Sequence, residues 1–382
     1  MGVPVSQAPK FAKYPLSQAP VYSRWWTSFA VLSAAVLISG KLVFSDFYEL
    51  RIIVIVALGV LCLWLLAFLV RVLCFRLDQH NAYCYGVNTQ QLEQAWWSRH
   101  RQTVALVESV LLGAVCRSAE QKHALFSPDL TKPTPEQTDD GWAIRVPQVF
   151  GKDVAEREAQ LAALLALQWQ QQRSDLPVEQ PLRCYWQGTP AAWNSFAEQV
   201  KKLWPTAQFP ERPDVWQGID SLDAIVDQLH EEPAEAWILC AGCQSSPIQR
   251  ESRLPAGEAA VLWVLGKQEG VRIARGEWLN ADVESLAAVA ERALRQSELE
   301  ASGPPCVSFS QPDLPDVSAI GWNLRQHLQD ANFGALGNLE SMVVLTLAAW
   351  YAEGNSKACA WLANDPQHTL AIGVVKPDDS TN

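Results

Sequence analysis

The sequence is poor in positive charge and in histidine. Its 30 Lys and Arg residues are outnumbered by 41 Asp and Glu residues, which gives a formal net charge of −11. This balance excludes a nucleic-acid partner on electrostatic grounds, because a phosphate backbone is bound by an excess of Lys and Arg. Only six histidines are present, and "HEEP" at His230 lacks the second histidine of the H-E-x-x-H zinc motif. No Gly-rich phosphate loop occurs either, so we expect neither a metal nor a cofactor.

The sequence also lacks a regular cysteine framework. Its nine cysteines are odd in number and irregularly spaced, unlike those of a secreted disulfide scaffold. Cys240 and Cys243 in "AWILCAGCQSS" have the C-x-x-C spacing that serves redox centres and zinc sites. A redox motif places its first cysteine at a helix N-terminus, whereas Cys240 lies inside an apolar run, and a zinc site needs a second pair of ligands. We therefore predict packed thiols, reduced in a cytoplasm, with a redox role as the weaker alternative.

Two apolar runs stand near the N-terminus. Residues 52–70, "IIVIVALGVLCLWLLAFLV", contain no charge and are long enough for one bilayer crossing as a helix. Residues 25–44 form a weaker run that includes several hydroxyl side chains and Lys41. Because only "SDFYELR" separates the runs, the sequence predicts a two-helix transmembrane hairpin over residues 25–76, after a tail at residues 1–24. A single span with an amphipathic helix is the alternative.

The charges that flank the hairpin predict its orientation. The N-terminal tail carries Lys10, Lys13 and Arg24 and no acidic residue, and four arginines follow the second run between residues 71 and 101. The short connection between the runs holds two acidic residues and one arginine. The positive-inside rule therefore places the tail and everything after the hairpin in the cytoplasm.

The rest of the chain divides into three parts by composition. Residues 77–126 have apolar side chains at near-helical spacing and are predicted to form a helical connector. Residues 127–141 are rich in Pro, Thr and Asp and are predicted to be a linker. Residues 142–382 alternate apolar strands with amphipathic helices, which predicts an α/β domain with helices covering its sheets. A helix–strand–strand succession occurs twice in it, at residues 221–266 and 339–376, which indicates an internal duplication.

Three stretches of this domain resemble the thiolase-like fold of the β-ketoacyl synthases. "EAWILCAGCQSS" is similar to the family's strand that ends in small residues near a serine. "LPAGEAAVLWVLGK" is similar to the adjacent strand, which follows a Gly-Glu-Ala-Ala step, and "LGNLESMVVLTLAAWYAEG" is similar to a buried helix of the family. The resemblance covers residues 142 to 377 and implies a duplicated thiolase-like α/β domain.

The same resemblance implies an acyl-transfer site that this chain lacks. The family uses a cysteine at the head of a buried helix together with two histidines, or with a histidine and an asparagine. The matching helix here is "GIDSLDAIVDQL", without a cysteine, and the two histidine steps fall at Gln311 and Asn338. These two residues are degenerate catalytic positions, because an acyl carrier needs a thiolate and an imidazole for its activation. Glu258 in "PAGEAA" could be a catalytic carboxylate, but the simpler interpretation is that the stretch is a turn leading into a strand.

A degenerate enzyme on a membrane anchor indicates an interaction protein. Inactive thiolase-like proteins accompany effectors of bacterial type VI secretion, so the resemblance implies a cytoplasmic adaptor on the bacterial inner membrane that binds an effector before export. Tethering would raise its local concentration there. The resemblance also implies self-pairing, as a homodimer or as a pseudo-dimer with a paralogue. Because tryptophan is enriched at binding hot spots, four residues are candidates for partner binding: Trp193, Trp204, Trp216 and Trp322.

Two other functions remain open at this point. An acyl-transferring or condensing enzyme of the thiolase-like class would need a relocated nucleophile, for which Cys184 and Cys306 are the candidates. A subunit of a larger membrane complex would use its hairpin to pack against other spans.

Overall fold

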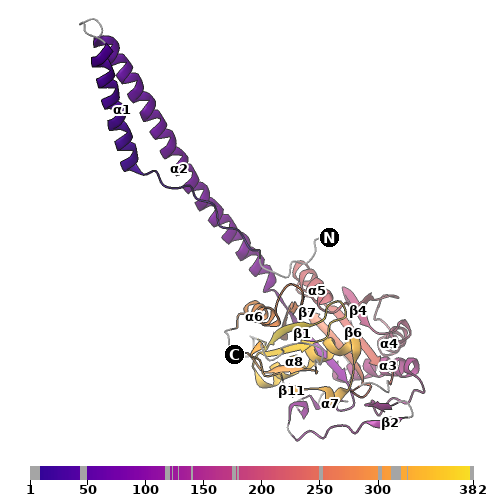
Figure 1. Ribbon diagram of the computed structural model, residues 1–382. Helices are drawn as coiled ribbons and strands as arrows, with labels where there is room; N and C mark the ends of the chain where they lie inside the picture. Colours follow the sequence, from indigo (N-terminus) through magenta and orange to yellow (C-terminus); the bar gives the residue numbers. More distant parts are fainter. Residues whose placement is uncertain are drawn as a thin grey trace. The chain divides into compact units, whose positions relative to one another are not determined.

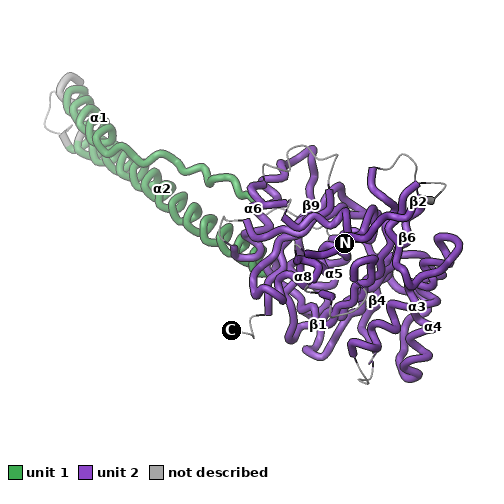
Figure 2. The backbone as a smooth tube through the Cα atoms, turned by 90° about the horizontal axis from the view of Figure 1, so that it is seen from below, with its two compact units in different colours: residues 1–98 green, residues 99–382 purple. Residues whose placement is uncertain are grey.

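The structure is a computed structural model of the 382-residue chain. It describes residues 9–43, 50–116, 121–122, 124–127, 129–138, 141–173, 178, 180–248, 253–299, 303–310, 320–324 and 326–378. The chain divides into two compact units, residues 1–98 and residues 99–382, which are coloured separately in Figure 2.

Two long helices make up most of the first unit (Figure 1). α1 spans Tyr22–Val43, and α2 spans Leu50–His100 and so continues into the second unit. The helices pack as an antiparallel hairpin through aromatic rings. Trp25 lies 5.4 Å from Phe68 between ring centroids, and Phe29 lies 5.0 Å from Trp64. The predicted helical hairpin therefore forms, and an aromatic cluster holds its helices together.

The prediction that both helices cross a membrane is supported for only one of them, among the described residues. Among the described residues, one helix is long and apolar enough to cross a membrane, at Val54–His100, and the apolar window within it is wholly unburied. In α1, the hydroxyl groups of Thr27, Ser28 and Ser39 donate to backbone carbonyls three or four residues earlier. These hydroxyls are satisfied within the helix, but they lower its hydropathy. A two-span hairpin therefore stays a prediction.

The predicted connector and linker boundaries are wrong. The helix of residues 77–126 ends at His100, and Thr103–Leu112 form β1, a strand inside the main sheet. β1 is buried at residues 104–106 and 110–112, with the exposed Val107 between them, so its apolar residues do not alternate strictly and imitate helical spacing. The second unit accordingly begins at Arg99, and residues 127–141 lie inside it. Part of that predicted linker pairs as β2 (Glu136–Thr138) with β3 (Gly141–Ala143).

The second unit is built on one mixed sheet. Its described strands follow the order β11-β10-β12-β13-β8-β1-β7-β6-β4-β5, with β9 beside β13. The bounds are β4 Arg183–Gln187, β5 Asp214–Val215, β6 Ile238–Ser245, β7 Glu258–Gly266, β8 Val271–Ala274, β9 Glu277–Trp278, β10 Cys306–Ser308, β11 His327–Leu328, β12 Cys359–Ala363 and β13 Ala371–Lys376. The helices are α3 Val154–Arg173, α4 Pro190–Leu203, α5 Ile219–Glu231, α6 Leu286–Gln296, α7 Asp330–Phe333 and α8 Glu340–Asn355, with 3-10 turns η2 Ala124–Phe126 and η4 Gly337–Leu339.

The strand order confirms the internal duplication. β4 pairs in parallel with β5 and with β6, and β6 pairs antiparallel with β7. In the second half, β10 pairs in parallel with β11 and with β12, and β12 pairs antiparallel with β13. Each half enters its last two strands from a helix, α5 in the first and α8 in the second. β1 and β8 join the two halves in the middle of the sheet.

Because side chains alternate between the two faces of each strand, the buried residues form separate core layers. Ile238 and Cys240 on β6 and Trp361 on β12 belong to a central cluster with α5 and α8. The alternate residues of the first half pack under α3 and α4, and those of the second half pack under α6. The layers therefore run helix, sheet half, central helices, sheet half, helix. α8 is apolar and buried around most of its circumference, as expected for a helix with protein on all sides.

Candidate functional site

The head of α5 corresponds to the stretch where the resemblance places a catalytic cysteine. The helix begins after Gly218, whose φ of 66° turns the chain into it. The backbone N–H of Ile219 donates to Asp365 Oδ2 at 2.9 Å. The first N–H groups of a helix have no partner within the helix and bind anions readily. Here the anion is supplied by the chain itself, from the loop between β12 and β13.

Asp365 is held by three backbone amides. Besides the Ile219 bond, its Oδ1 accepts the N–H groups of Gln367 and His368, each at 3.1 Å. The residue is only 9% exposed. Burial raises the pKa of this carboxyl above its ordinary value of 3.8, and the three hydrogen bonds offset that effect in part. Amides from two distant segments thus converge on one buried carboxylate.

The other polar side chains at the head of α5 also have partners. His368 Nε2 lies 3.3 Å from Asp220 Oδ1, and the imidazole stacks on Trp278 with ring centroids 4.2 Å apart. The hydroxyl of Ser221 accepts the N–H of Gln217 at 2.8 Å and is buried. Among the described residues, this region therefore brings a carboxylate to an imidazole, and the buried hydroxyl serves to cap the turn.

The first side chain of α8, Glu340, is bound from the same loop. The carboxylate of Glu340 accepts two hydrogen bonds from Asn364, from the backbone N–H at 2.9 Å and from Nδ2 at 3.0 Å. The N–H of Leu339 donates to Gln244 Oε1 at 3.2 Å. Adjacent loop residues therefore bind the heads of both central helices. The sequence signal at this place is the "NDP" step after an apolar strand, which predicts a turn and does not identify its distant partners.

Of the two predicted degenerate catalytic positions, the structure describes Asn338 but not Gln311. Asn338 lies in η4 just before α8 and is exposed, while Gln244 and Asn364 make the polar contacts around that helix head. Gln311 lies outside the described residues, so its assignment stays a prediction.

The C-x-x-C pair lies on β6, and its two thiols face opposite sides of the sheet. Successive strand residues alternate between faces, so residues three apart cannot share one. Cys240 belongs to the central cluster, whereas Cys243 packs under α3, and both are free and fully buried. Burial raises the pKa of both thiols well above their ordinary value. The predicted packed thiols are confirmed.

The two candidates for a relocated nucleophile are buried as well. Cys184 on β4 is 2% exposed and Cys306 on β10 is 0% exposed. Burial raises the pKa of Cys184 to about 12, with Asp214 adding to the effect, and raises that of Cys306 well above its ordinary value. Since the thiolate is the nucleophilic form of cysteine, neither site favours nucleophilic attack.

Glu258 marks the start of β7 and is fully buried. Arg157 binds it through two nitrogens at 2.7 and 2.8 Å. The N–H of Val146 and the hydroxyl of Ser245 donate to it at 2.7 and 2.8 Å. Four donors therefore surround the carboxylate and tie α3 to the sheet. This arrangement fits the strand-entry interpretation of "PAGEAA" rather than a free catalytic base.

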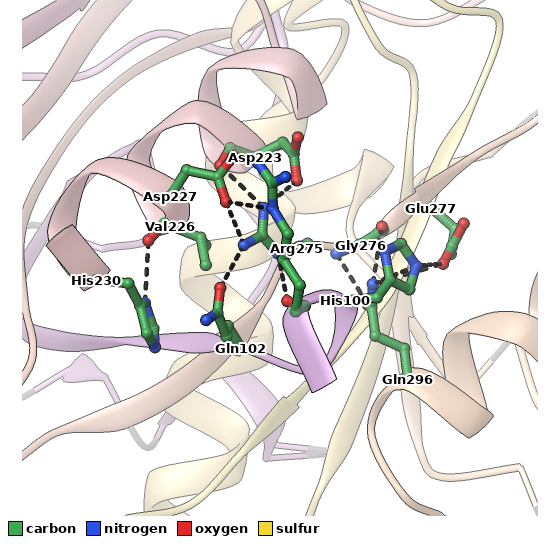
Figure 3. Close-up of polar contacts among 11 residues, drawn as sticks. His100, Gln102, Asp223, Val226, Asp227, His230, Arg275, Gly276, Glu277 and Gln296 are labelled. Atoms are coloured by element: carbon green, nitrogen blue, oxygen red, sulfur yellow. Dashed lines mark hydrogen bonds and ion pairs between the residues drawn. The ribbon is translucent and has the colours of Figure 1, made fainter. Parts of the chain in front are cut away.

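Arg275, which follows β8, is a buried side chain at the centre of an ion-pair network with two half-buried aspartates (Figure 3). Its side chain is 3% exposed and donates to Asp223 and Asp227 at 2.5 Å each. It also donates to Gln102 Oε1 at 2.7 Å and to the carbonyl of Arg99 at 3.1 Å. The network fastens residues 99–102, which lead into β1, to α5.

His100 takes part in a neighbouring network (Figure 3). Its Nε2 lies 2.6 Å from Glu277 Oε1 and 3.0 Å from Gln296 Nε2. Glu277 is nearly fully buried and also binds Arg292 at 2.6 Å, which in turn binds Glu284 at 2.7 Å. This imidazole is therefore a member of a structural ion-pair chain. Within the described residues, no group of three or more His, Cys, Asp or Glu side chains is arranged to hold a metal ion.

The four tryptophans predicted to bind a partner lie in the core. Their exposed fractions are 2% for Trp193, 8% for Trp204, 3% for Trp216 and 7% for Trp322. Trp193 packs against Phe196 in the outer layer, and Trp216 packs against Trp263 at the centre. This packing leaves little of each indole available to a partner. The most exposed aromatic side chains in the described second unit are Trp142 at 52% and Phe150 at 80%, neither of which is among the predicted partner-binding residues.

Comparison with known proteins returns similarities of fold only. No family model matches the sequence, and no curated protein matches it. Among solved structures, the acyltransferase ChlB3 is 16% identical with a TM-score of 0.45, over 72% of this chain and 98% of its own. The ishigamide ketosynthase/chain length factor is 14% identical with a TM-score of 0.48, over 72% and 99%. OleA from Xanthomonas campestris bound with cerulenin is 11% identical with a TM-score of 0.41, over 72% and 97%.

These TM-scores lie below 0.5 and the identities lie below 25%. The duplicated α/β architecture rests on the repeated strand order and the paired central helices of the chain itself. Nothing about activity follows from these similarities.

Proposed function

We propose that the chain is a membrane-anchored, catalytically inactive scaffold of the thiolase-like type that binds a protein partner. The observation that carries the proposal is that polar groups at the N-termini of α5 and α8 are already bound by loop residues of the chain. The amide at the head of α5 is bound by Asp365, and Glu340 at the head of α8 is bound by Asn364. An acyl-transfer centre needs a nucleophile with an adjacent base and free donors for the developing oxyanion. Here the donor at the head of α5 is already engaged by a carboxylate.

The buried thiols support inactivity further. An enzyme with a relocated nucleophile would use Cys184 or Cys306, but both are enclosed in the core with raised pKa values. Substrate could reach either thiol only if a layer of the domain opened. The enzyme alternative therefore has no observation in its favour among the described residues.

The proposed setting is the cytoplasmic face of a bacterial inner membrane. The apolar window in Val54–His100 supports one span, and α1 would supply the second. Basic residues on the tail and after the second run support cytoplasmic ends. The resemblance to degenerate thiolase-like proteins suggests a type VI secretion effector as the partner, held near the membrane before export.

The partner surface is expected to include exposed aromatic side chains. Trp142 and Phe150 offer large apolar contact areas that water covers in the free chain. The test is affinity purification of the full chain from native membranes, followed by mass spectrometry. We expect one protein to be enriched in stoichiometric amount, and to be lost when Trp142→Ala and Phe150→Ala are combined. Val283→Ala, which removes a 67% exposed apolar side chain elsewhere, is the matched control and should retain the partner.

Co-purification of no protein, together with measurable turnover of an acyl thioester, would contradict the proposal. Retention of the partner by the doubly substituted chain would refute the role of these two side chains.

A further inference from the structure

An apolar stripe runs along one face of α2 in the first unit. Seven positions follow one another at alternating intervals of four and three residues: Leu66, Val70, Leu73, Leu77, His80, Cys84 and Val87. Such intervals keep residues on one face of a helix and form the seam of a coiled coil. The first four side chains are 51–58% exposed, so the stripe offers a contact surface to a second helix.

The N-terminal tail lies on another face of α2. It binds Arg71, Asp78 and Tyr85, which are seven residues apart and therefore lie on one side of the helix. At 3.6 residues per turn, that side lies roughly 140° round the helix from the stripe. α1 packs against Trp64 and Phe68, which lie about as far from the stripe. These contacts leave the stripe exposed.

Two side chains of the stripe are metal ligands by type. His80 and Cys84 lie one turn apart on the seam, and His80 Nε2 is 3.6 Å from Cys84 Sγ. In a tetrahedral zinc site, bonds of about 2.3 Å to sulfur and about 2.0–2.1 Å to nitrogen place these two ligand atoms about 3.5–3.6 Å apart. The pair therefore has the spacing of one edge of a zinc tetrahedron. His80 is exposed, and Cys84 is half-buried and forms no disulfide.

One chain supplies only half of such a site. A structural zinc ion takes four ligands, and the described residues of one chain hold no group of three or more suitable side chains. A second copy supplies the other half, because the apolar window of α2 would carry every anchored copy through the membrane in the same direction. Parallel helices in register place equal seam residues opposite each other. His80 and Cys84 of both copies then meet in adjacent layers of the seam.

We propose that two copies of the chain pair in parallel along this stripe and bind one Zn²⁺ through His80 and Cys84 of each copy. The inference goes beyond the proposed function and rests on it in one respect, the anchoring of α2 in a membrane. Each thiol releases its proton on binding, so two thiolates balance the charge of the dication. The sequence motifs predicted no metal because they collect all ligands in one chain, whereas this site divides them between two.

The zinc content of the purified full chain tests the metal site. The protein is extracted in detergent under reducing conditions, freed of any polyhistidine tag, loaded with zinc chloride and passed into metal-free buffer before elemental analysis. We expect one zinc ion for every two chains, and its loss in His80→Ala and in Cys84→Ala. Cys74→Ala is the matched control and should keep the zinc, because Cys74 is exposed on the same helix and has no histidine one turn away.

Cobalt in place of zinc identifies the ligands. The wild type and Cys74→Ala should show the thiolate charge-transfer band and the d–d bands of tetrahedral Co²⁺, and Cys84→Ala should show neither.

Oxidative cross-linking in native membranes tests the pairing. In a chain with Cys62→Ala and Cys74→Ala, a mild oxidant should join two copies through Cys84 once a chelator has removed the metal. Added zinc should suppress this cross-link, and a further Cys84→Ala substitution should abolish it.

A full chain that binds no zinc, or whose zinc survives both ligand substitutions, would overturn the proposal and leave a thiol–imidazole contact within one helix. Zinc bound by monomers, one ion per chain, would overturn it too, as would absence of the Cys84 cross-link after chelation. The affinity purification of a partner is a separate measurement. Zinc binding without a partner would count against the proposed function alone, and a partner retained by a chain without zinc would count against the present inference alone.

Discussion

Asp365 accepts its hydrogen bonds from backbone amides. Its burial determines the direction in which its pKa is shifted. Desolvation disfavours the charged form more than three N–H donors favour it, so the pKa of this carboxyl is raised above 3.8. Between 3.8 and the raised value, the folded chain binds more protons than the unfolded chain. The contribution of this group to stability therefore falls as the pH rises through that window.

Asp365→Asn should remove this pH dependence while it keeps one acceptor for the Ile219 amide. The free energy of unfolding of the wild type, relative to the variant, is expected to decrease as the pH is raised from just below 3.8 and then to level off. Denaturant unfolding of both proteins across the acidic range measures the difference. An increase of the wild-type advantage over that window would show that the amides outweigh burial.

Cys240 and Cys243 are expected to act as two independent packed side chains. Because they face different layers of the core, replacing both by alanine should cost about 1–2 kcal/mol in total, as the sum of the single changes. Partner binding should be unchanged. Denaturant unfolding of the two single variants and the double variant checks the sum. A folded double variant that has lost its partner would instead indicate a chemical role for the pair.

At the scale of elements, the apolar and amphipathic patterns predicted the repeated helix–strand–strand units and failed at β1. The amphipathic α5 and the strands after it were predictable, and so was their repetition as α8, β12 and β13. β1 was predicted to be helical because its apolar residues at positions 104, 107, 110 and 111 recur at near-helical spacing instead of alternating. The cap of α5 by Asp365 was also beyond prediction, since its partners are 146 residues apart and hydrogen bonding between a loop and a helix leaves no periodic signal.

Arg275 binds the residues that lead into β1, so its replacement is expected to destabilise the domain. Replacing this side chain by methionine leaves Asp223 and Asp227 without their buried partner, and should destabilise the domain by about 2–4 kcal/mol. Arg99→Met is the matched control, because the Arg99 side chain is 71% exposed in its ion pair with Asp227, and it should cost less than about 1 kcal/mol. Denaturant unfolding measures both. Equal losses would show that burial of Arg275 is not the source of its contribution.

At the scale of the whole molecule, the chain joins a helical hairpin to a duplicated α/β domain through one continuous helix, α2. Two spans would return the chain to the side from which it started, whereas one span would place the tail and the domain on opposite sides. The number of spans therefore decides whether the domain meets cytoplasmic partners.

A reporter that is active only in the periplasm, fused after Asn382, should stay silent, and a cytoplasmic reporter at the same position should be active. The physical reason is the basic charge on both sides of the predicted hairpin. Expression of both fusions is verified by immunoblotting. Periplasmic activity would mean that a single helix crosses the membrane and that the domain faces away from the cytoplasm.

The central claim is that this domain forms no acyl-enzyme, because Asp365 engages the head of α5 and the thiols are buried in the core. The most direct test is intact-protein mass spectrometry of the purified full chain after incubation with short- and long-chain acyl thioesters. Peptide mapping then assigns any adduct. The account predicts no adduct on any cysteine of residues 99–382 at any incubation time; the exposed Cys62 and Cys74 lie outside this domain. A stable single adduct on Cys184 or Cys306 in the folded protein would contradict it.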